Sequence, residues 1–480
     1  MKEIITLQFG ESANYVGTHY WNMQQWQNMD DGCGDANSNL SMDVFYSEDD
    51  QGCVGQRGRR RFTPRVLIFD KVGNFGSLSQ SKAAPGTATS DNNDANDLAQ
   101  QWDGETEVYR QTPHVPPPLV SDSAVGDEPA EIQYWSDFNQ VEYSRAKSLT
   151  SVSGVEFGNS LGEMHTFQEG SDVFEGENRR DEMLEGKFRV LAEACDQVQG
   201  FQVLADAFGG FAGFSAGFVE KVREEHPKSS IMLYNVATDT RACGMNSAQT
   251  IDAAVGLATN LENVSATVNM YVPSALRKLG PVGVQVEESS RYQTSAFMAL
   301  NVSQWTQCLL TGTRRLDEMV NQVTQQQYFK VAETLISPEL QISDTNDDRF
   351  GSVAGLLEER FVASSDAVVR DLASMAGQLV VDRGTKLSRL VSERYSGTAY
   401  ADLGQTVALP RSFPRQMFQK ERIGVSGLLC TTAETGGYVQ RLHGAMQVER
   451  SRHIKDYERE WIREVRGVLD SVIDRYATIG

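Results

Sequence analysis

The pattern of apolar and polar residues between positions 200 and 236 predicts a strand, a loop, a helix and a second strand. Phe201 to Leu204 form one short apolar run and Ile231 to Val236 form another, and runs of this length are typical of buried strands. A glycine-rich turn and an amphipathic run that ends at Pro227 lie between them. We therefore expect a βαβ unit with its glycines where the loop enters the helix.

The same order of elements is predicted in other parts of the chain. A β-branched run over residues 3–8 predicts a strand, and the turn 9–14 leads into a helix. Residues 65–70 have the pattern of a second buried strand, which ends on a carboxylate. The remaining predicted elements are helix 183–198, helix 248–261, strand 266–272 and helix 292–310. Strands that alternate with helices favour an α/β fold, a parallel sheet covered by helices on both faces.

These signals weaken in residues 311–480. Residues 356–390 have a helical pattern, residues 423–430 resemble a strand, and residues 447–476 predict a long charged helix. The apolar stripe of that last helix includes Trp461, and we expect it to pack on the chain's own body rather than on a coiled-coil partner. A smaller α+β domain that ends in a long helix is therefore predicted here.

Residues 79–131 differ in composition from the rest of the chain. They contain ten acidic residues against only Lys82 and Arg110 as basic ones. So few apolar residues bury too little surface to offset the entropy of ordering the chain. We therefore predict a disordered acidic insert, which divides the sheet domain into a first part, 1–78, and a second part, 132–310.

Composition excludes several classes of function. A net charge of −21 argues against direct nucleic-acid binding, which needs a basic face. No apolar run approaches the roughly 20 residues of a membrane span, and Met1 to Ile5 lead directly into a strand, so we expect a soluble, cytoplasmic protein. The six cysteines and six histidines lack metal-site spacing, and no motif of nucleophilic catalysis occurs. No metal and no catalytic residue is therefore predicted.

Two loop-to-helix junctions, at Gly10 and Gly209, are the candidate binding features that remain. Free backbone N–H groups and the positive end of the helix dipole can hold a phosphate at such a place. Close packing of a helix on its neighbours is the alternative explanation for the glycines. If both junctions lie on neighbouring strands of one sheet, they predict a nucleotide site.

Several segments occur in an order that resembles the Misato family of tubulin-related proteins. The opening from Met1 to Asn22 also resembles the first strand, loop and helix of tubulins. The other similar segments are Pro64–Asp70, Trp135–Phe138, His165–Gly170 and Gly200–Asp206. The resemblance covers residues 1–310, apart from the acidic insert. It implies a tubulin-like parallel sheet with helices on both faces.

The resemblance also implies a degenerate nucleotide site. Phe211 and Phe214 stand in the glycine-rich loop where tubulins have small residues that let the backbone approach phosphate. Glu11 replaces a glutamine of tubulins, and a carboxylate about 4 Å from a phosphate repels it by about 1 kcal/mol in water and about 4 at intermediate dielectric. The residues carried over to this site are Gly10, Glu11, Asn14, Gly209, Gly210, Gly213, Asp252 and Tyr292.

The part of this site that would hold the guanine base is altered as well. Pro273 stands in place of the base-reading asparagine and Ala296 in place of a second polar base contact, while Tyr292 keeps a ring for stacking and Asp252 the place of the ribose-contacting acid. Residues 311–317 lack the Gly-x-x-Asn-x-Asp loop with which one tubulin completes its neighbour's GTPase site. We therefore expect no GTPase activity and no cofactor, and leave weak guanine-nucleotide binding open.

What the resemblance implies is a non-enzymatic role in mitochondrial distribution, morphology and mitochondrial DNA inheritance. The expected partners are proteins of the mitochondrial outer surface or cytoskeleton, or a chaperonin, and the expected location is cytoplasmic and mitochondrion-associated. One alternative is a GTP-binding polymer former like tubulin or FtsZ. A second alternative, a tubulin-folding or spindle-related adaptor, rests on family analogy alone.

Overall fold

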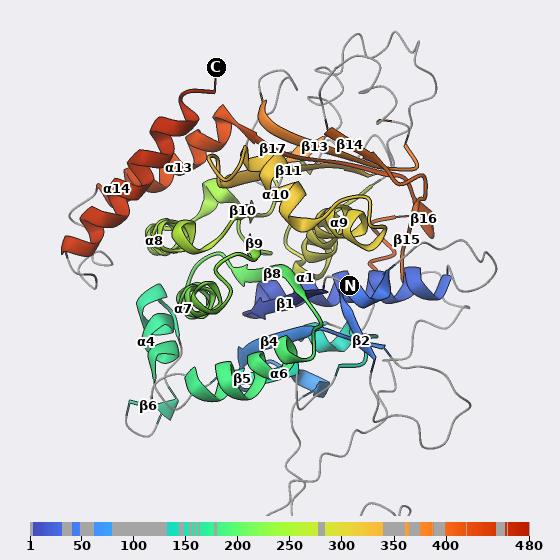
Figure 1. Ribbon diagram of the computed structural model, residues 1–480, viewed down its shortest axis with the longest axis horizontal. Coiled ribbons are helices and arrows are strands. Elements are labelled where there is room, and N and C mark those ends of the chain that lie inside the picture. The colour runs from blue at the N-terminus through green and yellow to red at the C-terminus, as the bar shows by residue number, and fades with distance from the viewer. Residues whose placement is uncertain are drawn as a thin grey trace, which may run out of the picture.

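The structure is a computed structural model, and Figure 1 shows its ribbon with helices on both sides of one large sheet. It describes residues 3–30, 41–48, 62–78, 132–143, 148–152, 156–157, 160–161, 164–176, 180–276, 284–338, 361–363, 375–385, 387, 399–418, 420–447, 457 and 459–479. The predicted acidic insert, 79–131, lies outside these residues.

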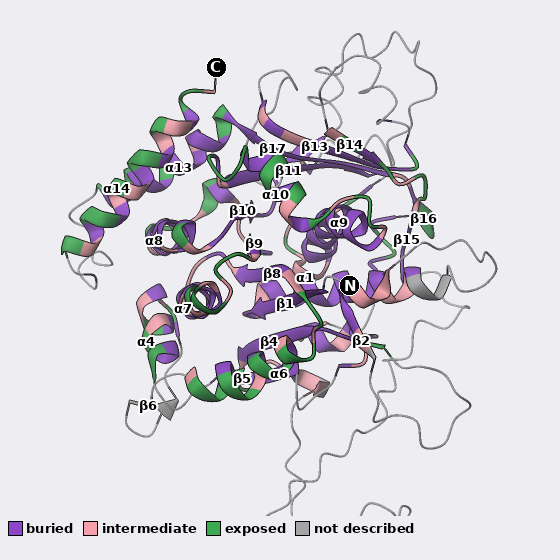
Figure 2. Cartoon of the chain, viewed as in Figure 1, coloured by how far each residue is buried: buried purple, intermediate pink, exposed green. Residues whose placement is uncertain are grey.

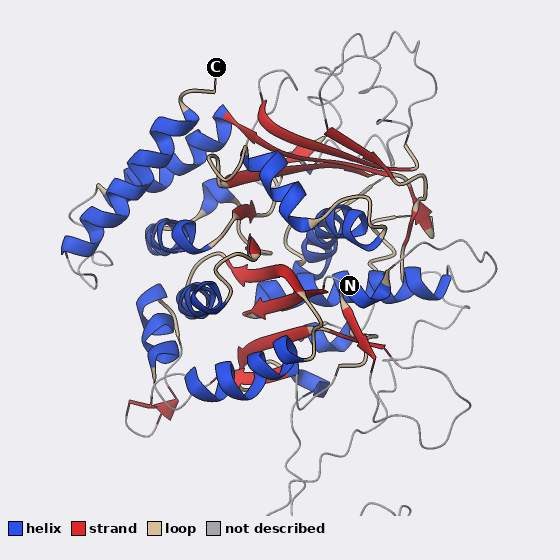
Figure 3. Ribbon diagram, in the orientation of Figure 1, coloured by secondary structure: helices blue, strands red, loops and turns tan. Residues whose placement is uncertain are grey.

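Among the described residues the main sheet has 11 strands, and six consecutive neighbours, in the order β10-β9-β8-β1-β4-β5, run parallel (Figure 3). This confirms the predicted parallel sheet. The strands are β1 (Glu3–Phe9), β4 (Val66–Lys71), β5 (Leu149–Val152), β8 (Val198–Asp206), β9 (Ser230–Val236) and β10 (Ala266–Met270). β1 and β8, which precede the two candidate junctions, are direct neighbours.

Helices cover both faces of this sheet because its strands are apolar on both sides. Ile4 of β1 packs in the core with α1 (Glu11–Asp30) and α9 (Arg291–Leu310), while Ile5 packs with α4 (Phe167–Glu175) and α7 (Gly210–Glu225). α8 (Ser247–Asn263) follows α7 on the latter side. Every residue of α9 from 293 to 310 is buried (Figure 2), so this helix lies inside the protein. α1 begins at Glu11, inside the segment predicted as a turn, because Gly10 already turns the chain.

Residues 311–480 continue the same sheet. β11 (Val331–Pro338) runs parallel to β10 over only two residue pairs and antiparallel to β17 (Val425–Thr432). β12 (Val362–Ala363) pairs with β11, and β13 (Met375–Arg383) and β14 (Ala399–Asp402) complete the edge. The predicted helix 356–390 is therefore wrong over 362–363 and 375–383, which form β12 and β13. β12 is paired with β11 and β13 with β17, and that pairing outweighs the local helical pattern.

Several other parts of the described chain form short elements. Between α4 and β8 the chain forms a π-helical stretch, η6 (Glu182–Phe188), and a short α6 (Arg189–Glu193). The predicted helix 183–198 ends early because Val198 pairs with Glu3 and begins β8. The remaining short elements are η2 (Met42–Val44), β2 (Tyr46–Glu48), β3 (Phe62–Pro64), η4 (Gly76–Leu78), η5 (Trp135–Phe138), β6 (Glu156–Phe157), β7 (Ser160–Leu161), η7 (Ala242–Gly244), α10 (Leu316–Thr324), β15 (Val407–Ala408) and β16 (Arg422–Ile423).

Two helices form the C-terminal end of the described chain. α13 (Ala433–Met446) packs beside α14 (Arg459–Tyr476), and both contact α8. The predicted helix 447–476 is thus shorter than expected, and residues 448–456 and 458 lie outside the described part. α14 buries one face, with Val465 and Leu469 at its centre. None of the described helices is long and apolar enough to cross a membrane.

We expect Trp461→Ala to lower the free energy of unfolding by about 2–3 kcal/mol. Its ring, half-buried at the start of α14, lies 5.0 Å from that of Tyr457 and 6.1 Å from that of Phe167. The cost should be below the 3–5 kcal/mol typical of a fully buried tryptophan. Urea denaturation measures it, with exposed Arg463→Ala as a control that should change little. Equal stability of the two variants would contradict packing of this stripe.

Candidate functional site

The strand register brings two carboxyl groups to either side of the first glycine junction. Phe9 of β1 is paired with Phe69 of β4 and with Ala205 of β8. The next residues along these three strands are Gly10, Asp70 and Asp206, so they lie side by side at the carboxyl edge of the sheet. Ligands of parallel sheets bind at this edge, and here it is acidic.

Asp206 fills the space beside Gly10 at the start of α1. Gly10 has φ +95°, and a Cβ there would lie 2.3 Å from Oδ2 of Asp206. Oδ1 of Asp206 accepts a hydrogen bond of 2.9 Å from the backbone N–H of Ala13, in the first turn of α1. Burial raises the pKa of Asp206 well above its usual range, and the Asp70 and Glu11 carboxyls add to this effect. The protein's own carboxyl group therefore takes a donor that a phosphate would use.

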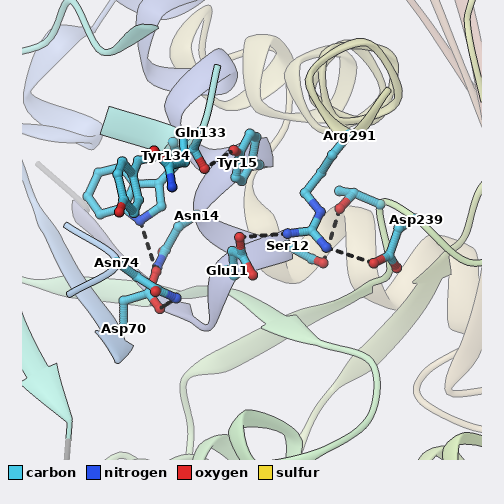
Figure 4. Close-up of polar contacts among 12 residues, drawn as sticks. Glu11, Ser12, Asn14, Tyr15, Asp70, Asn74, Gln133, Tyr134, Asp239 and Arg291 are labelled. Atoms are coloured by element: carbon cyan, nitrogen blue, oxygen red, sulfur yellow. Dashed lines mark hydrogen bonds and ion pairs between the residues drawn. The ribbon is translucent and has the colours of Figure 1, made fainter. Parts of the chain in front are cut away.

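Asp70 is the centre of a buried hydrogen-bond network. Oδ2 accepts from Asn14 Nδ2 and from Trp135 Nε1, each at 2.8 Å, and Oδ1 accepts from Lys71 N at 2.7 Å and from Asn74 Nδ2 at 2.9 Å. Burial raises the pKa of Asp70 to about 6, although these four donors lower it. Figure 4 shows Asn14 directed at Asp70 from α1. Asn14 thus links α1 to β4, and its amide nitrogen is not directed at a ligand.

Glu11 is paired with a cation from the core helix. Arg291, at the first turn of α9, lies 2.6 Å from Glu11 and 2.7 Å from Asp239 in the loop after β9 (Figure 4). Its guanidinium also lies 5.8 Å from the ring centre of Tyr15. The negative charge that we expected to repel phosphate is therefore matched by a positive one, and the three side chains tie α1, β9 and α9 together at the mouth of the site.

The second junction is held by Asp252 of α8. Its Oδ2 accepts from Gly209 N at 3.2 Å, and its Oδ1 accepts from Tyr457 Oη at 3.0 Å. Gly209 has φ +78° and caps the start of α7. Asp252 is only 6% exposed, so the carboxylate that we assigned to a ribose instead joins the glycine loop to Tyr457, two residues before α14.

Gly210 and Gly213 serve close helix packing. A Cβ on Gly213 would lie 1.8 Å from the carbonyl oxygen of Phe167 in α4, and one on Gly210 would lie 2.3 Å from the Cβ of Met164. Only glycine permits this approach.

Phe211 and Phe214 do not stand in the path of a phosphate, contrary to our expectation. Both lie in the apolar core between α7 and the sheet: the ring centre of Phe214 lies 6.0 Å from that of Phe9 and 6.1 Å from that of Phe211. The reason is that α7 already begins at Gly210, so the helix turns both rings toward the strands.

Tyr292 is surrounded by other aromatic side chains. Its ring centre lies 4.9 Å from that of His19 and 5.0 Å from that of Phe138, and its hydroxyl donates to the carbonyl of Ser412. Burial lowers the pKa of His19 to about 3, so the imidazole is neutral. The ring that would stack on a base is thus already packed against the protein.

The structure brings the predicted site residues together at the carboxyl edge of the sheet. Most of them, however, contact other side chains or backbone groups of the protein. Sequence reasoning missed Asp206, Arg291 and Tyr457. For Asp206 a signal existed, because a carboxylate ends this buried strand pattern as Asp70 ends the other; for the contacts of Arg291 and Tyr457 we see none. Within the described part of the chain, no group of three or more metal-ligating side chains occurs. The N–H groups of Ala13 and Gly209 and the ring of Tyr292, which a guanine nucleotide would use, already contact other protein groups. The site in this structure therefore does not fit such a ligand.

Comparison with known proteins matches the first two thirds of the chain. A family model described as the Misato Segment II tubulin-like domain matches residues 2–120, and one described as the Tubulin domain matches residues 126–309. The matches end near residue 310, as the resemblance in the sequence does, but the first also covers residues 79–120, which we assigned to the acidic insert.

Relatives with similar sequences include Protein DML1 of Gibberella zeae, 29% identical over 305 residues, which are 62% of this chain and 59% of the relative. Protein dml1 of Aspergillus clavatus is 28% identical over 310 residues, covering 62% and 58%. Protein misato homolog 1 of Pongo pygmaeus is 27% identical over 279 residues, covering 49% and 45%. The chain thus spans just under three fifths of the length of these fungal relatives. With its tubulin-like α/β sheet and these matches, the chain carries over residues 2–309 the tubulin-like domains of the Misato family of tubulin-related proteins.

Proposed function

We propose that this chain is a non-enzymatic tubulin-like protein that acts through contacts with other proteins in mitochondrial distribution, morphology and mitochondrial DNA inheritance. One observation supports the non-enzymatic part of the proposal: the groups of the predicted nucleotide site already bind or pack against other groups of the protein. Asp206 and Asp252 accept hydrogen bonds from the two loop-to-helix junctions, and Tyr292 packs against His19 and Phe138. A nucleotide would have to displace all of these groups, of which Asp252, His19 and Phe138 are buried and Asp206 and Tyr292 are partly buried.

The mitochondrial part of the proposal rests on the resemblance to the Misato family. The place of action proposed is the cytoplasm and the mitochondrial surface, with outer-surface or cytoskeletal proteins as partners. A fold like that of tubulin does not by itself imply tubulin's activity. The principal alternative is therefore a GTP-binding polymer former, and a tubulin-folding or spindle-related adaptor is the second.

We expect GTP and ATP to bind too weakly for detection by isothermal titration of nucleotide-free full-length protein. Glu11→Gln, which restores the residue of tubulins, is the matched variant. This variant should not bind GTP either, because Asp206 still accepts the hydrogen bond from Ala13 and Tyr292 still packs against His19 and Phe138. A micromolar or tighter constant for GTP, with clear discrimination against ATP, would replace our proposal with the polymer-forming alternative.

The partner class is tested separately, by affinity capture of the full chain from cells and mass spectrometry. Enrichment of proteins of the mitochondrial outer surface supports the proposal. Enrichment of chaperonin subunits and tubulin alone would favour the adaptor instead.

A further inference from the structure

An ordered basic loop lies between β15 and β16. We use this name for residues 409–422, which include the first residue of β16 and which the structure describes except for residue 419. Val407 pairs with Ile423 across its base, and Leu409 N donates to Glu421 O at 2.8 Å. Two internal turns, Phe413 N to Pro410 O at 3.0 Å and Met417 N to Pro414 O at 3.1 Å, shape the rest.

The basic loop separates apolar from charged side chains. Phe413, Met417 and Phe418 are buried in the main core and anchor the loop. Its exposed charged residues are Arg411, Arg415, Lys420, Glu421 and Arg422. Four cations against one anion make this loop positive in a chain whose net charge is −21. Such a surface fits an acidic peptide.

The chain's own acidic segment leaves the folded body beside this loop. The structure describes the chain up to Leu78 and again from Ile132, shortly before η5. Asn22 Nδ2 donates both to Phe138 O of η5, at 2.8 Å, and to Ser412 Oγ of the basic loop, at 2.9 Å. The His19 ring lies 4.3 Å from that of Phe138 and 5.5 Å from that of Phe413. Two side chains of α1 therefore bridge the end of the segment and the basic loop.

The other end of the segment leaves from the same place. Phe75, just before η4, has its ring 5.6 Å from that of Trp135 in η5. A Cβ on Gly76 would lie 2.4 Å from Ser136 Oγ. Both ends of the undescribed stretch thus meet at η5, so that stretch is tethered at two points near the basic loop.

Six of the ten acidic residues of this stretch lie in residues 91–107, which contain no Lys or Arg. We propose that the basic loop is a docking surface for this segment of the same chain. About 13 residues separate it from Leu78, and a chain of that length spans up to about 40 Å, enough to reach the loop from η5. Tethering raises the local concentration of this segment at the basic loop to the millimolar range. Weak contacts then suffice for docking, although each exposed ion pair contributes only about 0–1 kcal/mol.

Carbodiimide cross-linking of the full-length protein tests this, because the reagent joins carboxylates to amines in direct contact. Lys420 is the reporter and stays unchanged in every variant. We expect cross-links between Lys420 and residues 91–107 in monomeric protein at about 20 mM salt, and a roughly fivefold loss at about 500 mM, where charges are screened within a few ångströms.

The matched variants are Arg411→Glu with Arg415→Glu, and Arg459→Glu with Arg463→Glu on the exposed face of α14. The first pair should lower the Lys420 cross-links roughly fivefold and the second should leave them unchanged. The inference is overturned if residues 91–107 cross-link equally to exposed Lys228, if charge reversal in the basic loop has no effect, or if the cross-links occur only in dimers, which would indicate a second copy.

Discussion

Gly213→Ala should destabilise the protein by about 3 kcal/mol or more, although alanine is the better helix former. Intrinsic propensity alone would make the substitution stabilising by about 0.5–1 kcal/mol. In the structure, however, the new Cβ would lie 1.8 Å from the Phe167 carbonyl oxygen and 2.9 Å from Ser171 N, both backbone atoms of α4. α4 would have to move away from α7, and overpacking of this kind typically costs 1–3 kcal/mol or more.

Two other glycines provide a graded comparison for urea denaturation. A Cβ on Gly217 would meet the ring of Phe174 at 2.5 Å, a side chain that can shift, so Gly217→Ala should cost less. Gly467 of α14 has no atom within 4 Å of the Cβ position and is exposed, so Gly467→Ala should stabilise by about 0.5–1 kcal/mol. Stabilisation by Gly213→Ala as well would mean that α4 does not pack on α7 as described.

Asp70→Ala should lower the free energy of unfolding by about 3–5 kcal/mol at pH 5. The substitution removes the acceptor of Asn14, Trp135, Lys71 N and Asn74 at once. An unsatisfied buried donor costs about 1–3 kcal/mol. Water that enters the new cavity would accept hydrogen bonds from some of these donors and so reduce the total cost. For this reason we do not expect the loss to exceed the upper end of the range.

The cost of Asp70→Ala should be smaller at pH 8. Burial raises the pKa of this carboxyl to about 6 from 3.8, so the stability that the protonated group contributes is fully present below pH 3.8 and is lost as the pH rises through 6. The wild type therefore loses about 1.5 kcal/mol from this group between pH 5 and 8, and the variant does not. Urea denaturation at the two pH values, with exposed Asp474→Ala as control, measures the difference. An equal cost at both pH values would contradict a titrating buried Asp70.

Local sequence patterns were sufficient for most elements of the sheet domain. The predicted strand–loop–helix–strand unit at 200–236 corresponds to β8, α7 and β9, and helix 292–310 corresponds to α9. Each of these elements has a continuous apolar or amphipathic run, whose period is a property of adjacent residues. The prediction failed over 356–390, because β13 is held by antiparallel pairing with the distant strand β17. Such pairing leaves no local signal that separates it from a helical pattern.

The chemistry of the site was decided by tertiary structure. The sequence identified Gly10, Gly209, Gly210 and Gly213, but glycine serves equally to admit a phosphate and to admit a neighbouring helix. The positions of Met164 and Phe167 show the second use for Gly210 and Gly213.

What the sequence by itself determined is the order of elements, the acidic balance of the chain and its kinship to the Misato family. Tertiary structure alone decided which side chains face one another: strand register places Asp70 and Asp206 on either side of Gly10, and the start of α9 brings Arg291 to Glu11. These pairs join residues 60 or more positions apart. They are fixed by the pairing of whole strands and the packing of helices, and no local pattern specifies either.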